Sequence, residues 1–249
     1  MTNNWEAEAV ARIGAYIERN GPIPDKRSFP VYAATWHGWF DTTKLPERPR
    51  WSELALDVLS DLEPDEGVPA ARDGRRIDRR YLLRLSQAAA ADDSDDARVR
   101  LLFATMLWGS GTSNGRGPRY AAAALSDDRL VGVLRETAEL VRSGDLAQAH
   151  RRFRVHGIGP SFLTKWFWAL GLSTDARPRP LILDSIVAGT LADLSLRPWP
   201  LYGGGAPGRY VDYVRLLDEW SNKLPVSAEG IEQVLFEGAA ALPKSAPSP

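Results

Sequence analysis

Three residues with side chains capable of chemistry lie close together in the second half of the chain: Ser161, Lys165 and Asp184. Asp184 follows the apolar approach RPLIL at a predicted helix start, where a carboxylate caps backbone N–H groups. A carboxylate held beside a sugar also stabilises the positive charge that develops as a glycosidic bond breaks. Lys165 carries an amine, and burial is one way in which a lysine becomes a nucleophile. A plain helix cap and a catalytic carboxylate are therefore both open for Asp184.

The stretch RVHGIGPSFLTKWFWALG, residues 154–171, predicts a tight hairpin followed by a helix. The glycines accept positive φ, and Pro160 suits the first turn of a helix. The start of that helix presents unpaired N–H groups that bind anions such as phosphate. We therefore expect a clamp for the DNA backbone, formed by Gly157, Ile158, Gly159, Arg151, Arg152 and Arg154. A purely structural turn between two helices is the alternative.

The helix that begins at Pro160 has two distinct faces. Its apolar stripe consists of Phe162, Leu163, Trp166, Phe167 and Leu170. Ser161, Lys165 and Trp168 fall together on another face. On this face Trp168 could stack on a base or pack against a neighbouring domain, and Lys165 could contact a base or a phosphate.

Hairpin, aromatic helix, loop and aspartate, in this order, resemble the helix-hairpin-helix (HhH-GPD) DNA glycosylase superfamily. The likeness is clearest over residues 151–191, and it is greatest to bacterial 8-oxoguanine DNA glycosylase-like proteins. The ending IEQVLFEGAA of this chain also resembles the ending of those proteins. The resemblance implies an all-α protein in which a six-helix bundle packs against a second helical domain, with the active site in the cleft between them. It makes Gly157 and Gly159 the hairpin glycines and Asp184 the catalytic aspartate. It also implies that the face with Ser161, Lys165 and Trp168 lines the pocket for the flipped base. It implies no cofactor beyond a K⁺ or Na⁺ ion at the backbone near these glycines.

The chain departs from this family's pattern at the nucleophile. Bifunctional members carry a lysine two residues after the second hairpin glycine, where this chain has Ser161. Serine there resembles the monofunctional branch, in which water attacks, so strand-nicking lyase activity is in doubt. Lys165, one helical turn further on, remains the alternative nucleophile. The interval from Gly159 to Asp184 is also longer than usual, with the excess in STDARPR.

A glycine-rich loop, WGSGTSNGRGPRY, occupies the place from which the family inserts a wedge into DNA. A base leaves the stack at a cost of a few kcal/mol, and a side chain must fill the gap. Asn114 and Arg116 are the candidates, and a surface loop without a role in DNA binding is the alternative.

The chain is expected to divide into three parts. An N-terminal helical region, residues 1–93, is expected to pack with the C-terminal helices of residues 201–242. Residues 94–200 are expected to form the six-helix-bundle and hairpin domain, which carries the catalytic aspartate. Residues 243–249 read as a disordered tail. Within the first part, Ser52 is expected to cap one helix, and residues 72–90 are expected to form a basic helix. No pair of strands is expected.

Composition excludes several classes of function. The absence of cysteine removes disulfides, thiolate zinc sites and cysteine nucleophiles, and the three histidines lack metal-ligand spacing. Net charge is −1, but residues 142–180 hold seven basic against two acidic side chains, which suits a DNA partner. Neither a signal peptide nor a membrane span is recognisable, so we expect a soluble, cytoplasmic monomer.

Together these features predict a metal-independent enzyme that flips a damaged base, such as 8-oxoguanine, from double-stranded DNA and hydrolyses its N-glycosidic bond during base excision repair. Two alternatives remain. One is a glycosylase that removes hypermodified phage bases in defence, and the other is a helix-hairpin-helix DNA-binding module without catalysis.

Overall fold

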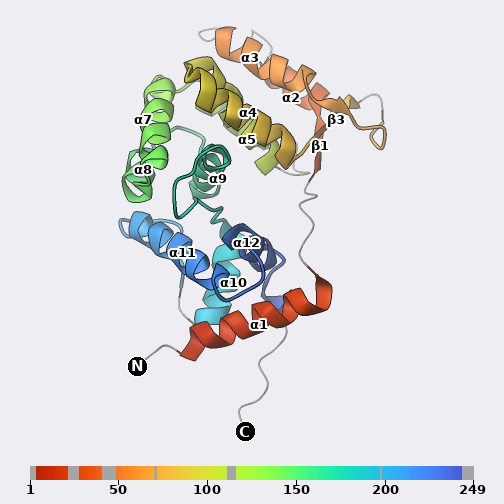
Figure 1. Cartoon of the computed structure of the whole chain (residues 1–249). Coiled ribbons are helices and arrows are strands. Elements are labelled where there is room, and N and C mark those ends of the chain that lie inside the picture. Colours follow the sequence, from red (N-terminus) through yellow and green to blue (C-terminus); the bar gives the residue numbers. More distant parts are fainter. Residues whose placement is uncertain are drawn as a thin grey trace.

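The computed structural model describes residues 4–21, 28–40, 49–69, 72–110, 116–196 and 198–242. The chain is predominantly helical, as expected, and carries one small sheet that was not expected (Figure 1). Among the described residues no helix is long and apolar enough to cross a membrane. Asn114 and the tail of residues 243–249 lie outside the described residues.

The helices of the first half are α1 (Asn4–Asn20), α2 (Ala33–Phe40), α3 (Pro49–Ser60), α4 (Arg79–Asp92), α5 (Asp95–Gly109) and α6 (Gly117–Leu125). The helices of the second half are α7 (Leu130–Arg142), α8 (Leu146–Arg152), α9 (Pro160–Gly171), α10 (Ser185–Ser195), α11 (Ala206–Ser221) and α12 (Ala228–Phe236), followed by the short 3₁₀ helix η2 (Ala239–Ala241).

Helix α5 is the centre of the first group of helices. Every side chain from Leu101 to Trp108 is buried, because this stretch is apolar on all sides and therefore packs in every direction. Helices α3, α4, α6, α7 and α9 all contact it, and α2 packs on α3 and α6. Ser94 caps α5 by accepting a hydrogen bond from Ala97 N–H.

A second group of helices brings the two ends of the sequence together. Figure 1 shows α1 lying across α10 and α12, and α11 packs on α8 and α12. The rings of Trp5 and Trp220 meet edge-on at 6.0 Å, which joins α1 to α11. Helix α9 belongs to the first group by its packing on α4, α5 and α7, and its connections lead through the hairpin to α8 and through residues 172–184 to α10.

The sheet consists of three short antiparallel strands in the order β1-β3-β2. They are β1 (Phe29–Tyr32), β2 (Glu63–Pro64) and β3 (Gly74–Ile77), with Phe29 opposite Ile77 and Glu63 opposite Arg76. The predicted basic helix over residues 72–90 was therefore wrong at its start. Asp78 ends the strand and caps α4 through Tyr81 N–H, so the helix begins at Arg79.

The predicted cap at Ser52 was also wrong. Helix α3 begins at Pro49, since proline fits the first turn, and this places Ser52 inside the helix and buries it.

Candidate active site

A pocket of about 430 Å³ brings together Ser161, Lys165 and Asp184. It lies among the start of β1, the end of α5, the first half of α9, the segment before α10, and α12. Its wall is formed by Phe29, Trp108, Gly109, Ser110, Ser161, Phe162, Lys165, Ile182, Asp184, Ser185, Ile186, Glu232 and Phe236. The pocket is thus mainly aromatic and apolar, with a few polar groups, as is usual for a small-molecule site.

Asp184 is held in one orientation by the helix that it caps. Its Oδ1 accepts hydrogen bonds from Ile186 N–H and Val187 N–H, each at 3.0 Å, at the positive end of α10. Its other oxygen, Oδ2, lies 3.8 Å from Lys165 Nζ. Both side chains are about nine-tenths buried, with 10% and 11% of their surface exposed. Asp184 therefore has both roles: its Oδ1 caps α10, and its Oδ2 faces the pocket.

Lys165 reaches the pocket by passing over the end of α5. A Cβ added to Gly109 would stand 2.8 Å from Lys165 Cδ and 2.7 Å from Phe162 Cε1, so only glycine allows α9 to approach here. The Lys165 ammonium group also lies 5.5 Å from the centre of the Phe162 ring. The lysine is therefore part of the wall of the site, whereas its position in an isolated helix would be exposed.

The extended segment before Asp184 has a buried backbone that side chains from three helices satisfy. The groups concerned are those of Leu181, Ile182 and Leu183, which are all buried. Tyr210 donates to Leu181 O and Tyr213 to Ile182 O, while Glu232 accepts from Ile182 N–H and Thr164 bonds both backbone groups of Leu183. Because burial of each unsatisfied backbone group is costly, this network holds the segment in one conformation and fixes where Asp184 begins α10.

The two tyrosines of this network remain hydrogen-bond donors. Burial, followed by the nearby Glu232 carboxylate, raises the pKa of the Tyr213 hydroxyl well above its usual range. Burial likewise raises the pKa of Tyr210, against the effect of its hydrogen bond to Leu181. Both hydroxyls therefore keep their protons throughout the range of pH in which enzymes work.

Trp168 lies outside this pocket. It is 2% exposed and stacks on Trp108 with ring centres 5.1 Å apart, and its Nε1–H donates to Glu229. The guanidinium of Arg79 lies 4.8 Å from its ring centre and pairs with the same Glu229. Trp168 thus joins α4, α5, α9 and α12 behind the site, because α9 is buried on nearly all sides and has no free aromatic face.

Ten residues of the wall were not among the predicted site residues, and those with an aromatic or acidic side chain are Phe29, Trp108, Phe162, Glu232 and Phe236. Phe29 comes from the unexpected strand β1, and its ring meets Trp108 edge-on at 6.0 Å. Glu232 and Phe236 are one turn apart on α12 and therefore share a face. Glu232 is 1% exposed, and the sequence signal that could have found it was a carboxylate among the apolar residues of the ending IEQVLFEGAA.

The predicted hairpin is present between α8 and α9. Gly157 has φ +79°, and a Cβ there would stand 2.6 Å from Tyr120 O, so glycine is required both by conformation and by contact with α6. Ile158 N–H donates to Val155 O, and His156 N–H donates to Asp127. The side chain of Arg129, followed by the N–H groups of His156 and Arg129, holds the pKa of Asp127 well below its usual range. Gly159 caps α9 without a side-chain bond.

The three arginines upstream of the hairpin have different surroundings. Arg151 bonds Gln148, and Arg152 pairs with Glu136 at 3.2 Å. Arg154 turns back to donate to the carbonyls of His150 and Phe153, at 2.9 and 2.8 Å. Of the three, Arg154 therefore lies nearest the hairpin.

The start of α6 lies against the end of α5 at the pocket. Ser110 lines the pocket at the end of α5, and a Cβ on Gly117 would stand 2.4 Å from Ser110 Oγ. Arg116, the residue before α6, is exposed. Arg116 thus precedes the residue that contacts Ser110, while the other wedge candidate, Asn114, is outside the described residues.

Comparison with known proteins gives one match. The model of the family described as "Putative 8-oxoguanine DNA glycosylase OGG-like protein" matches residues 24–236, which include β1, the hairpin, Asp184 and α12. No curated protein and no solved structure matches the chain. Since the match covers most of the sequence, the chain belongs to the 8-oxoguanine DNA glycosylase OGG-like family.

Proposed function

We propose that the protein is a DNA glycosylase that takes a modified base, such as 8-oxoguanine, into this pocket and breaks its N-glycosidic bond. The observation that carries the proposal is the buried pair of Asp184 and Lys165, 3.8 Å apart in a pocket of aromatic side chains. Planar bases stack on aromatic rings, and Phe29, Phe162 and Phe236 offer such rings. The family to which the chain belongs supports the same substrate class.

The hairpin supports DNA as the partner because it stands on the same helix as the pocket. Gly159 begins α9, and Ser161 and Lys165 follow within two turns. A duplex held by its phosphates at the uncapped end of α9 would therefore present its bases beside the pocket opening. We infer that the enzyme acts as a monomer on double-stranded DNA, with Arg116 and Asn114 as the wedge candidates.

A K⁺ or Na⁺ ion at the hairpin would have to be held by main-chain carbonyls of residues 155–159. The carboxylate that reaches the hairpin, Asp127, already accepts hydrogen bonds from Arg129 and from His156 N–H. Such an ion would add a positive charge for a DNA phosphate, and nothing in the chemistry at Asp184 depends on it.

Asp184 would stabilise the positive charge on the sugar as the base departs. Its Oδ1 is hydrogen-bonded to the N-terminus of α10, so the carboxylate is already oriented and Oδ2 need not move when the charge develops. Two nucleophiles could then complete the reaction. Ser161 stands where bifunctional members carry their catalytic lysine, which favours water as the nucleophile, and attack by water would leave an intact abasic site.

The burial of Lys165 against Asp184 favours its amine instead. In that route the neutral amine attacks C1′, the base leaves with the bonding electron pair and takes up a proton, and the sugar ring opens to an imine. We propose the lysine route because the amine lies within the wall of the pocket. The two routes differ in whether a covalent intermediate forms.

The test uses duplexes that each carry one modified base, including 8-oxoguanine and hypermodified cytosines. Strand cleavage is measured with and without alkali. Asp184→Asn should keep duplex binding and lose base release, while Asp193→Asn, an exposed change on the same helix, should leave release unchanged. Base release by Asp184→Asn at the wild-type rate would refute the assignment. Release restricted to hypermodified bases would favour phage defence over repair.

A further inference from the structure

A second open pocket, of about 460 Å³, lies against the hairpin on another face of α9. Its wall includes His150 and Arg154 at the end of α8, Gly159 of the hairpin, and Leu201, Tyr202 and Gly203 before α11. None of these residues lines the pocket of Asp184. The sequence PLYGGGAPG, which reads as a plain linker, is therefore the wall of a concave site beside the predicted DNA clamp.

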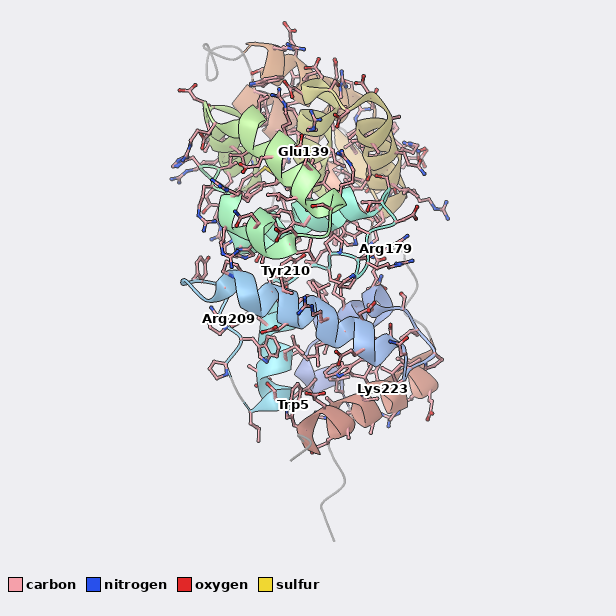
Figure 2. The ribbon with its side chains drawn as sticks, turned by 60° about the vertical axis from the view of Figure 1, so that its left-hand side comes forward. Trp5, Glu139, Arg179, Arg209, Tyr210 and Lys223 are labelled. Atoms are coloured by element: carbon pink, nitrogen blue, oxygen red, sulfur yellow. The ribbon has the colours of Figure 1, made fainter. Side chains whose placement is uncertain are left out.

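Two helices begin at this pocket, and neither has a side-chain cap. Gly159 is the N-cap of α9 and Gly205 is the N-cap of α11. Pro160 and Pro207 carry no N–H group, and Ala206 N–H already donates to Gly203 O, so the two helices present mainly the positive ends of their dipoles to a ligand. Figure 2 shows α11 crossing this side of the molecule, with Arg209 at its N-terminal end and Lys223 beyond the other.

Two arginines add positive charge that carboxylates do not cancel. Arg154 donates to the carbonyls of His150 and Phe153, and Arg209 donates to the carbonyls of Pro200 and Tyr202. In the part of the chain that the structure describes, neither pairs with an acid. Arg129 at the same pocket differs, because Asp127 neutralises it.

His150 supplies an observation that is independent of the helix ends. It is 7% exposed, lines the pocket, and its Nδ1 has no hydrogen-bond partner within the described chain. Burial, and then the charge of Arg154, lowers its pKa to about 4, so the ring is neutral at pH 7. A buried polar nitrogen without a partner is uncommon and unfavourable, and a ligand atom in the pocket would supply the missing partner.

Tyr202 stands at the mouth of the pocket. It is 73% exposed, and its hydroxyl lies 4.0 Å from the place that a Cβ on Gly159 would occupy. The hydroxyl is therefore close to the hairpin backbone, where it could donate to an oxygen of the same ligand.

We propose that this pocket binds a phosphodiester of the DNA backbone, next to the one that the hairpin holds. The positive ends of two helix dipoles, Arg154 and Tyr202 lie around this pocket, and Arg209 bonds the backbone of its wall at Tyr202. The segment from Tyr202 to Gly205 would thus form the second wall of the DNA clamp. The proposal rests on the proposed function in one respect, that duplex DNA is the partner. Residues before α11 thereby acquire a role in DNA binding.

The test measures the affinity for an unmodified duplex by fluorescence anisotropy over a range of salt concentrations. Gly204→Asp places a negative charge at the pocket, and a Cβ at Gly204 meets nothing within 4 Å. We expect it to weaken binding about tenfold or more and to lower the salt slope by about 0.9, the effect of one lost phosphate contact. Tyr202→Phe removes one hydroxyl and should weaken binding by roughly threefold to tenfold.

The matched control is Gln87→Glu, which makes the same change in charge at an exposed position of α4. It should bind within twofold of the wild type. Circular dichroism and thermal melting verify that every variant is folded. If Gly204→Asp and Tyr202→Phe both bind like this control while the wild type binds DNA, the second wall does not exist and the inference fails.

Failure of the proposed function looks different, since the wild type itself would then bind no duplex. A parallel melting series in inorganic phosphate distinguishes the sources of the anion. If phosphate raises the Tm of the wild type but not that of Gly204→Asp, and DNA affinity is equal in both, the pocket binds free phosphate and the assignment to DNA is overturned.

Discussion

Thr164 bonds the backbone of Leu183 in both directions. Its Oγ1 accepts from Leu183 N–H at 3.1 Å and lies 3.2 Å from Leu183 O, to which it can donate. Thr164 precedes Lys165 and Leu183 precedes Asp184, so this one contact sets α9 and α10 in register at the site. The distance of 3.8 Å between the amine and the carboxylate follows from it.

Thr164→Val should therefore slow base release while it leaves the shape of the pocket unchanged. It keeps the shape of the side chain but leaves two buried backbone groups of Leu183 unsatisfied, at a cost of about 1–3 kcal/mol in the free energy of unfolding. We expect kcat for base release to fall with little change in duplex affinity. Thr164→Ser, which restores the hydroxyl, should recover most of the rate. Equal rates for Thr164→Val and wild type would show that the contact does not position Asp184.

Lys165 is expected to form a covalent intermediate with the sugar. Borohydride reduces an imine to a stable amine, so wild-type protein incubated with its substrate duplex should give a cross-linked product on a denaturing gel. Lys165→Gln should abolish the cross-link, and Ser161→Ala should retain it. Base release by wild type without any cross-link would instead identify water as the nucleophile, as the serine at position 161 suggests.

What could be predicted from the sequence was local, and what could not depends on contacts between distant segments. The hairpin and the cap at Asp184 each depend on residues that are adjacent in the sequence, so both were located correctly. Phe29 and Glu232 reach the pocket from opposite ends of the chain, and no local pattern brings them together. The sequence of the short strand β3 is rich in arginine, like that of the helix after it, so both were interpreted as one helix, which in fact begins only after its cap Asp78. Trp168 was placed in the pocket because a helix surrounded by protein on nearly all sides has no polar face to distinguish.

The two hairpin glycines should respond differently to alanine. At Gly157, the positive φ and the contact with Tyr120 O make a Cβ costly, so Gly157→Ala should lower both Tm and DNA affinity. At Gly159, φ is −87° and the nearest atom to a Cβ is 4.0 Å away, so the free protein should keep its Tm. Gly159→Ala should nevertheless weaken duplex binding, because the added methyl would stand between the hairpin backbone and the phosphate. Unchanged affinity for Gly159→Ala would show that DNA does not approach this backbone.

His150 should make the fold sensitive to mild acid. Its pKa is about 4 in the folded protein, against about 6.5 when unfolded, because it is buried and faces Arg151 and Arg154 from its own end of α8 and Arg209 and Tyr210 from α11. Between these values the unfolded chain binds the extra proton, so stability is complete above pH 6.5 and falls as the pH drops toward 4.

The expected loss between pH 7.5 and pH 5 is about 2 kcal/mol in the free energy of unfolding, measured by urea denaturation at each pH. Asp127 does not contribute in this window, since its own pKa lies well below it. His150→Gln should flatten the dependence, even if it lowers stability at every pH. His37→Gln, a change at an exposed histidine, should keep the wild-type slope. An unchanged slope in His150→Gln would mean that the acid sensitivity arises from another group.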